Sequence, residues 1–129
     1  MRIKTHKMAS ERLVGKALTV NAGFAEVQLR TLDEMAVDEY GLVHGGFTFG
    51  LADYAAMLAV NEPTVVLGKA EVKFLKPVKA GEILTAKAGI AEDLGKKKLV
   101  KVEVLNESDE RVFEGTFHCY VLDRHVLEG

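Results

Sequence analysis

The stretch that decides the fold runs from His44 to Asn61 and reads HGGFTFGLADYAAMLAVN. It contains no proline, shows no alternation of period two and carries strong helix formers from Leu51 to Ala59, so we expect a helix that stops at Pro63. Because the segment is apolar almost all the way round, this helix should be buried on every side. Asp53 is the exception, since a buried carboxylate is costly unless it is paired or used.

Length and composition indicate one domain. The chain has 129 residues, a hydrophobic content of 48% and a formal net charge of -2, which gives no reason to expect a nucleic-acid partner. We treat residues 1–129 as a single domain, with residues 1–12 as a loosely ordered N-terminal segment. The single Cys119 fits a reducing compartment. The sequence shows neither a signal peptide nor a membrane span, so we expect a cytoplasmic protein with no membrane partner.

The segments around the helix alternate between apolar and polar residues, as half-buried strands do. One such strand precedes the helix and four follow it, with these apolar faces: Ala25, Val27 and Leu29; Val66, Gly68, Ala70, Val72 and Phe74; Leu84, Ala86, Ala88 and Ile90; Val100, Val102 and Val104; Phe113, Gly115, Phe117, Cys119 and Val121. A capping box from Thr31 to Glu34 predicts a short helical turn. Because sequential strands pair antiparallel, we expect one or two strands, the helix and then a four-stranded meander.

A helix that is apolar all round and a sheet that is apolar on one face can both bury their apolar surfaces if the sheet curls round the helix. The expected fold class is therefore α+β. One sheet cannot cover the whole circumference of the helix, so we expect a second copy of the chain to cover the far side across a two-fold axis. The alternative is a monomer in which the N-terminal thirty or so residues close that side.

Three features of the sequence carry a resemblance to a known family. They are His44-Gly45-Gly46, the following Leu51-Ala52-Asp53, and the later stretch FLKPVKAG from Phe74 to Gly81. Together they resemble the hotdog-fold acyl-CoA thioesterase superfamily, in particular the phenylacetate-pathway (PaaI-like) type, over most of the chain.

The resemblance has consequences for structure and function. It implies a hotdog fold, a curled antiparallel sheet of five to six strands around one central helix, and homodimers that often pair into homotetramers. It implies hydrolysis of a small or medium acyl or aryl thioester of coenzyme A, with no cofactor beyond the coenzyme A of the substrate. It also implies that Asp53 acts as nucleophile or general base and that the Gly45 amide polarises the thioester carbonyl.

The spacing of these two residues tests the idea independently of the family. Gly45 and Asp53 are eight residues apart, which on one helix is roughly 12 Å of axial rise. A base and an oxyanion donor must both approach one carbonyl carbon to about 3 Å, so one chain cannot supply both. If two such helices run antiparallel across a dimer axis, Gly45 of one lies near Asp53 of the other, and two equivalent sites result.

At such a site the thioester carbonyl would accept hydrogen bonds from the amides of Gly45 and Gly46, at the positive end of the helix. Asp53 of the partner chain would activate a water or attack to form a mixed anhydride, and apolar surroundings should raise its pKa. The alternative is a structural Asp53 that only bonds backbone across the interface.

Other residues are weaker candidates for substrate binding. His44 could orient the substrate, Thr48 flanks the site on the helix, and Lys76 and Lys79 make a basic edge that could meet coenzyme A phosphates, although such lysines are commonly solvated. The remaining histidines show no ligand spacing, so no metal is expected: His6, His118 and His125.

Two positions depart from the family pattern. Asp38 stands where these thioesterases usually carry an Asn, and its charge would oppose a developing oxyanion nearby. Leu67 stands where a Ser or Thr is often offered to the catalytic carboxylate. These departures favour a second hypothesis, an acyl-CoA-binding hotdog protein with a regulatory or accessory role and little turnover. A third hypothesis, a hydratase or dehydratase of acyl thioesters, lacks an obvious second acid-base residue.

Overall fold

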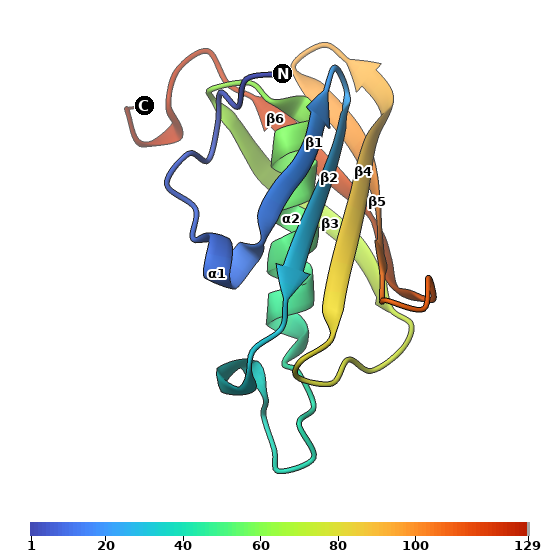
Figure 1. Ribbon diagram of the computed structural model, residues 1–129. Coiled ribbons are helices and arrows are strands. Elements are labelled where there is room, and N and C mark those ends of the chain that lie inside the picture. The colour runs from blue at the N-terminus through green and yellow to red at the C-terminus, as the bar shows by residue number, and fades with distance from the viewer. Residues whose placement is uncertain (129) are drawn as a thin grey trace.

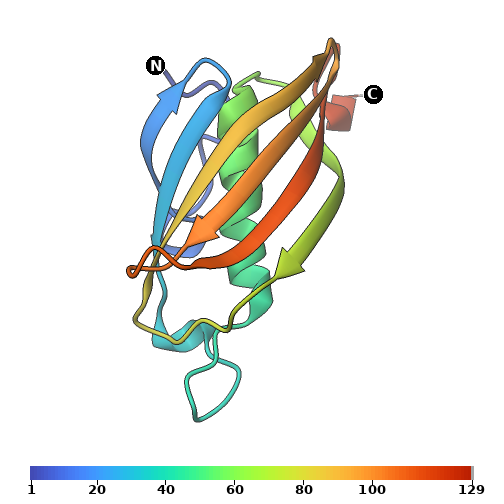
Figure 2. The same cartoon turned by 90° about the vertical axis from the view of Figure 1, so that its right-hand side faces the viewer.

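The structure is a computed structural model that describes residues 1–128. In chain order its elements are α1 (Glu11–Val14), β1 (Lys16–Asn21), β2 (Phe24–Arg30), the 3-10 turn η1 (Asp33–Met35), α2 (Gly45–Val60), β3 (Val65–Phe74), β4 (Ile83–Leu94), β5 (Lys97–Leu105), β6 (Arg111–Val121) and the 3-10 turn η2 (Val126–Glu128). The strands form one six-stranded antiparallel sheet that curls around α2, as Figures 1 and 2 show. The predicted α+β hotdog fold is confirmed. No helix within the described residues is long and apolar enough to cross a membrane.

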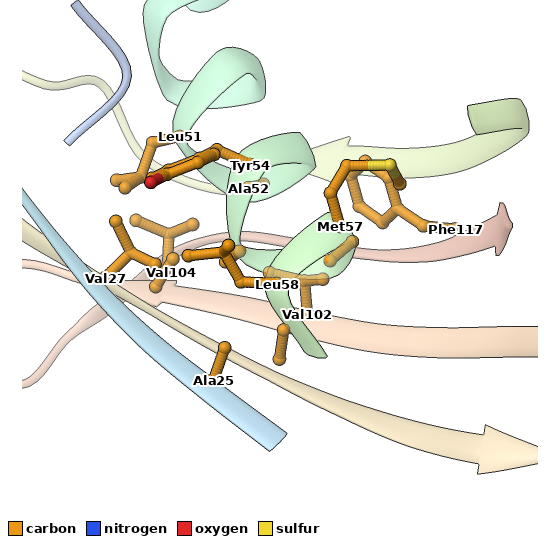
Figure 3. Close-up of a cluster of buried hydrophobic side chains, with 14 of the residues drawn as sticks. Ala25, Val27, Leu51, Ala52, Tyr54, Met57, Leu58, Val102, Val104 and Phe117 are labelled. Carbon is orange, nitrogen blue, oxygen red and sulfur yellow. The ribbon is translucent and has the colours of Figure 1, made fainter. Parts of the chain in front are cut away.

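Helix α2 lies where the sequence predicts it. His44 is its N-cap, and Asn61 is a C-cap in the left-handed conformation, with a φ of 52°. From Leu51 to Val60 every residue except Asp53 is buried, because the sheet wraps this part of the helix. Figure 3 shows side chains of α2 packed among residues of the strands, including Leu51, Met57, Leu58, Val27, Val102, Val104 and Phe117.

The strand order differs from the predicted four-stranded meander. The order across the sheet is β1-β2-β4-β5-β6-β3, so β3 pairs with β6 and not with β4. Residues 75–82, which link β3 to β4, cross the end of the molecule where α2 begins instead of making a tight hairpin (Figure 2). Only β4, β5 and β6 form a meander. As a result β3 is an edge strand, and its outer side pairs with no strand within residues 1–128.

The predicted apolar face of β3 is also wrong in its first half. The register shifts between Leu67 and Lys69, which pair with Cys119 and His118 respectively. Such a bulge inserts one extra residue and reverses the alternation. Leu67 therefore lies on the same face as Ala70, and the predicted placement of Val66 and Gly68 on that face does not hold.

The predicted capping box at Thr31 is not formed. The Thr31 hydroxyl donates to the carbonyl of Glu82 at 2.7 Å, and its oxygen accepts from the amide of Gly81 at 3.0 Å. The cap position of η1 is Leu32. Thr31 therefore ties the end of β2 to the link that precedes β4, because a long-range partner competes successfully with the local cap.

The N-terminal segment, for which the sequence predicts loose order, has defined contacts. The side chain of Asn61 accepts from the amide of Lys4 at 2.8 Å and donates to the carbonyl of Arg2 at 2.9 Å. Residues Glu11–Val14 form α1, which packs against α2 close to Gly50. This segment covers part of the side of α2 that the sheet leaves open.

Candidate active site

Asp53 lies in the middle of α2 with its carboxylate largely removed from water. Its Oδ1 atom is buried and has no hydrogen-bond partner within the described residues. Burial raises the pKa of Asp53 from the ordinary value of 3.8 to about 6. A carboxylate that is poised near neutral pH and free of partners has the properties of a general base.

Cys119 of β6 lies close enough to Asp53 to be affected by its charge. The thiol is fully buried, and burial together with the Asp53 carboxylate raises the pKa of Cys119 to about 12. The thiol is therefore protonated at neutral pH and donates to the carbonyl of Phe117 at 3.7 Å. The sequence did not identify this neighbour, because only the curl of the sheet brings β6 against the middle of α2.

The start of α2 presents one free amide. The Nδ1 atom of His44 accepts from the Gly46 amide at 2.7 Å, so this expected donor is already used as a helix cap. The Gly45 amide has no acceptor within residues 1–128. It lies at the N-terminal end of the helix, where the helix dipole favours negative charge. Gly45 therefore offers the donor that an oxyanion requires.

An aromatic cluster connects the two groups along one side of the helix. Gly45, Phe49 and Asp53 are spaced by four residues and so lie in one row on α2. The ring of Phe49 lies 5.5 Å from that of Phe117, and the ring of Phe74 at the end of β3 lies 5.1 Å from that of Phe113. The row therefore faces the β6 and β3 side of the sheet.

The Phe74 ring forms a wall beside Gly45. An ideal Cβ atom placed on Gly45 would lie only 3.0 Å from the Phe74 Cε1 atom, although Phe74 remains 57% exposed. The absence of a side chain at Gly45 lets this ring approach the first turn of the helix. Phe74, which strand alternation alone would assign to the core, thus lies beside the first turn of α2.

The two reactive groups do not meet within one chain. Eight residues of α2 separate Gly45 from Asp53, which corresponds to roughly 12 Å of rise. Both keep partial exposure, unlike the rest of α2 beyond Asp53, and their row lies toward the unpaired edge of β3. The Gly45 amide and the Asp53 carboxylate therefore lie apart within one chain, on the side of the helix that faces the open edge of β3.

The structure gives Asp38 a local role. Its carboxylate accepts from the amides of Tyr40 at 3.0 Å and Leu42 at 3.2 Å, which organises the exposed loop before α2. Its charge is therefore partly satisfied by the backbone of its own loop. This arrangement reduces the expected conflict between Asp38 and an oxyanion at Gly45.

The other predicted substrate-binding residues are dispersed. Thr48 is buried in α2, and Lys76 forms an ion pair with Glu110 at 2.5 Å. Lys79 belongs to the link between β3 and β4, and its side chain lies against Gly41 of the loop before α2. The register of β3 places Leu67 opposite Cys119, on the Asp53 side of the sheet. Within residues 1–128, no three His, Cys, Asp or Glu side chains cluster closely enough to hold a metal ion.

A sheet curled round one helix, with a carboxylate in the middle of that helix and a glycine pair at its start, defines a protein of the hotdog class. Residues 40–113 match the model of the thioesterase superfamily. The chain belongs to this superfamily. It is 67% identical to an uncharacterized protein of Pyrococcus horikoshii, whose crystal structure matches with a TM-score of 0.97 over 98% of this chain and 97% of that one.

Two more distant structures share the fold. The PaaI protein of the Escherichia coli phenylacetic acid degradation operon is 24% identical, with a TM-score of 0.84 over 93% of this chain and 88% of that one. A Streptococcus mutans protein bound to acetyl-CoA is 25% identical, with a TM-score of 0.78 over 86% of this chain and 90% of that one. The predicted PaaI-like hotdog architecture agrees with both.

Two curated relatives are longer than this chain. A methylthioribose-1-phosphate isomerase of Aquifex aeolicus is 54% identical over 122 residues, which make up 95% of this chain but 26% of that protein. The transcription factor FapR of a Thermoanaerobacter species is 25% identical over 97% of this chain and 62% of its own length. The same domain thus occurs within proteins that have other named functions.

The unpaired burial of Asp53 should reduce stability at neutral pH. Because its folded pKa is raised, its stabilising contribution is fully present below about pH 3.8 and is lost as the pH rises through about 6. We expect Asp53→Asn to leave the free energy of unfolding nearly unchanged at pH 4 and to raise it by on the order of 3 kcal/mol at pH 8. Denaturant titrations at both pH values, at one protein concentration, measure this difference.

A matched variant separates burial from the change of residue type. Asp109 is exposed in the loop between β5 and β6 and has a φ of 60°, which Asn also tolerates. Asp109→Asn should show little change at either pH. An equal response of the two variants would contradict the assignment of the effect to burial of Asp53.

Proposed function

We propose that this protein is an acyl-CoA thioesterase that hydrolyses a small or medium acyl or aryl thioester of coenzyme A. The proposal rests on the buried Asp53, which lies in the same helix row as the Gly45 amide; among residues 1–128 neither Asp53 Oδ1 nor this amide has a hydrogen-bond partner. Membership of the thioesterase superfamily and the acetyl-CoA bound to the related Streptococcus mutans protein support this substrate class.

The proposed site is shared by two chains. A homodimer in which two copies of α2 run antiparallel would bring Gly45 of one chain beside Asp53 of its partner. The unpaired edge of β3 offers a surface for such a pairing, because edge strands readily pair with another chain. Two such dimers could associate further as a homotetramer. The buried free thiol of Cys119 suits a reducing cytoplasm.

In the proposed reaction the thioester carbonyl accepts a hydrogen bond from the Gly45 amide, and the partner's Asp53 acts on the opposite side. If Asp53 is the base, it takes a proton from water and the resulting hydroxide attacks the carbonyl carbon. If it is the nucleophile, a mixed anhydride forms and water hydrolyses it. In both routes the carbon–sulfur bond breaks, the thiolate gains a proton, and a carboxylic acid and free coenzyme A are produced.

The test is release of free thiol from a panel of acyl-CoA substrates with short, medium and aromatic acyl groups. Thiol release that saturates with substrate supports the proposal. Tight binding of acyl-CoA with no thiol release over the panel contradicts it.

The second candidate function is an acyl-CoA-binding regulator or accessory protein. It is favoured by Leu67, which offers no hydroxyl toward the Asp53 side of the sheet, and by the likeness to the transcription factor FapR over 97% of this chain. In this reading acyl-CoA binds at the same dimer site and is released unchanged. Thiol release distinguishes the two functions.

Phe74 is expected to limit the size of the acyl group. Its ring lies against the first turn of α2 beside Gly45, where the carbonyl would be held. We expect Phe74→Ala to raise kcat/KM for bulky thioesters relative to acetyl-CoA by about tenfold, because a pocket contact of this size discriminates to that extent. Leu75→Ala, which truncates the next exposed side chain, should leave the ratio unchanged. An unchanged ratio in Phe74→Ala would contradict the placement.

A further inference from the structure

A hollow of about 620 Å³ lies at the C-terminal end of α2, between the N-terminal segment and the first residues of β3. Both ends of the chain lie near this end of the helix (Figure 1). The lining includes Lys4, His6 and Lys7 of the N-terminal segment together with His125, and no acidic side chain is part of it. Neither lysine forms an ion pair within residues 1–128. The hollow therefore concentrates positive charge without compensation.

A buried polar residue builds this hollow. Asn61, which is only 4% exposed, fixes the backbone of Arg2 and Lys4 through its side chain amide. The next residue, Thr5, is buried and its hydroxyl is 2.7 Å from His6 Nδ1. His6 has a φ of 52°, so the chain turns there and brings Lys7 into the same lining. The cationic part of the lining is thus held by defined bonds of the backbone.

His6 and His125 add ring nitrogens to the lining of the hollow. Burial lowers the pKa of His6, so its ring is neutral at pH 7. His125 Nδ1 accepts from the Leu127 amide at 3.0 Å, which leaves Nε2 as the nitrogen that carries the proton in the neutral ring. The positive charge of the hollow comes from Lys4 and Lys7.

Another part of the lining forms an apolar wall. Pro63 and the β3 residues Val65, Val66 and Leu67 line it, with Met8 at its margin. An apolar wall in the same hollow as a pair of unpaired lysines suits a ligand with a flat, apolar ring system and a phosphate. A nucleotide combines both groups in one molecule.

We propose that this hollow binds the phosphorylated nucleotide end of a ligand, with phosphate at Lys4 and Lys7 and the base against the apolar wall. Where the ligand is coenzyme A, the inference rests on the proposed function, since the thioester end must then reach a dimer site that contains Asp53. Eight residues of α2 separate Asp53 from Asn61, which is roughly 12 Å. The extended pantetheine arm of coenzyme A is longer than this.

The test compares two charge-matched double variants of the full chain by isothermal titration calorimetry. Lys4→Gln with Lys7→Gln removes the cationic part of the lining, while the anchoring bond of Lys4 is made by its backbone amide and persists. Lys16→Gln with Lys87→Gln removes the same charge from exposed positions on β1 and β4. The probes are coenzyme A and adenosine 3′,5′-bisphosphate.

We expect the first double variant to bind both probes at least about tenfold more weakly, and the control to bind like the wild type. Weakening for both probes supports the inference, whereas weakening for coenzyme A alone contradicts it, because the bisphosphate carries the nucleotide end that the hollow is proposed to bind. Unchanged affinity for both probes overturns the inference. If the lysines only offset the negative charge at the C-terminal end of α2, the double variant will be less stable but will bind both probes with unchanged affinity.

The outcomes separate this inference from the proposed function. Hydrolysis of an N-acetylcysteamine thioester, which has no nucleotide, should be unaffected by Lys4→Gln with Lys7→Gln. If the protein hydrolyses thioesters but these variants bind nucleotides normally, only the inference fails. If it binds nucleotides through these lysines but hydrolyses nothing, only the proposed function fails.

Discussion

Asp53→Asn is expected to reduce kcat for thioester hydrolysis by about 10²–10⁴-fold, the range that a positioned general base contributes. Asn has nearly the shape of Asp but can neither take a proton from water nor attack the carbonyl. Since burial raises the pKa of Asp53 to about 6, the wild-type rate should rise with pH through this value as the carboxylate ionises. Thiol release measured between pH 4.5 and 8 checks both statements.

The control for this variant is again Asp109→Asn, an exposed position distant in the chain from α2. It should keep the wild-type rate and pH profile. Full activity of Asp53→Asn would contradict the role of this carboxylate. Loss of activity with unchanged acyl-CoA affinity would show that chemistry, and not binding, depends on it.

The second large effect is expected from Gly45→Pro. Proline is favoured at the first position of a helix and removes the one amide that Gly45 provides. His44 already has a φ of -60° and a ψ of 131°, which a following proline requires. Loss of one oxyanion donor should reduce kcat by about 10²–10³-fold. Gly45→Ala also places a Cβ atom close to the Phe74 ring but keeps the amide N–H, so it should retain most of the activity.

Mixing the two inactive variants tests the shared site directly. A mixed dimer of Gly45→Pro and Asp53→Asn has one site with both defects and one site with neither. With random exchange half of the dimers are mixed, so activity should recover to about a quarter of the wild-type value. The measurement is thiol release before and after co-refolding of the two purified variants.

Absence of recovery on mixing would contradict the shared site. A site within one chain, or a stable monomer, would give no recovery on mixing, because every chain would keep its own defect. The control mixture of Gly45→Pro with the active Asp109→Asn should show about half of the wild-type activity both before and after co-refolding, with no recovery. Comparison of the two mixtures therefore isolates the pairing of Gly45 with the partner's Asp53.

The local sequence pattern was sufficient to predict most of the helices and strands. The helix from Gly45 to Val60 agrees with the expected stretch because its signals are local: helix formers inside, a capping side chain at His44 and Asn61 before Pro63. The strands before and after it follow from alternation for the same reason. The failures at Thr31 and Gly68 have another cause, since both depend on partners distant in sequence.

The candidate site shows the same division. Asp53 could be identified from the sequence because a lone carboxylate in an apolar helix is conspicuous. The contact of Phe74 with Gly45 could not, because it depends on β3 reaching the far edge of the sheet. Two hydrogen bonds were also not predictable from the sequence, because both depend on backbone conformation. They are the bond from the Gly46 amide to His44 and the bond from the Tyr40 amide to the Asp38 carboxylate.

The sequence by itself determined a buried central helix, the presence of a sheet around it, and a separation of Gly45 from Asp53 that one chain cannot bridge. These follow from the helical rise and from the burial of apolar side chains, which act along the chain. Tertiary structure decided the order of the strands and, within residues 1–128, the free edge of β3 and the lack of a hydrogen-bond partner for Asp53 Oδ1. The reason is that these properties depend on which distant segments meet, and burial energy alone is not directional.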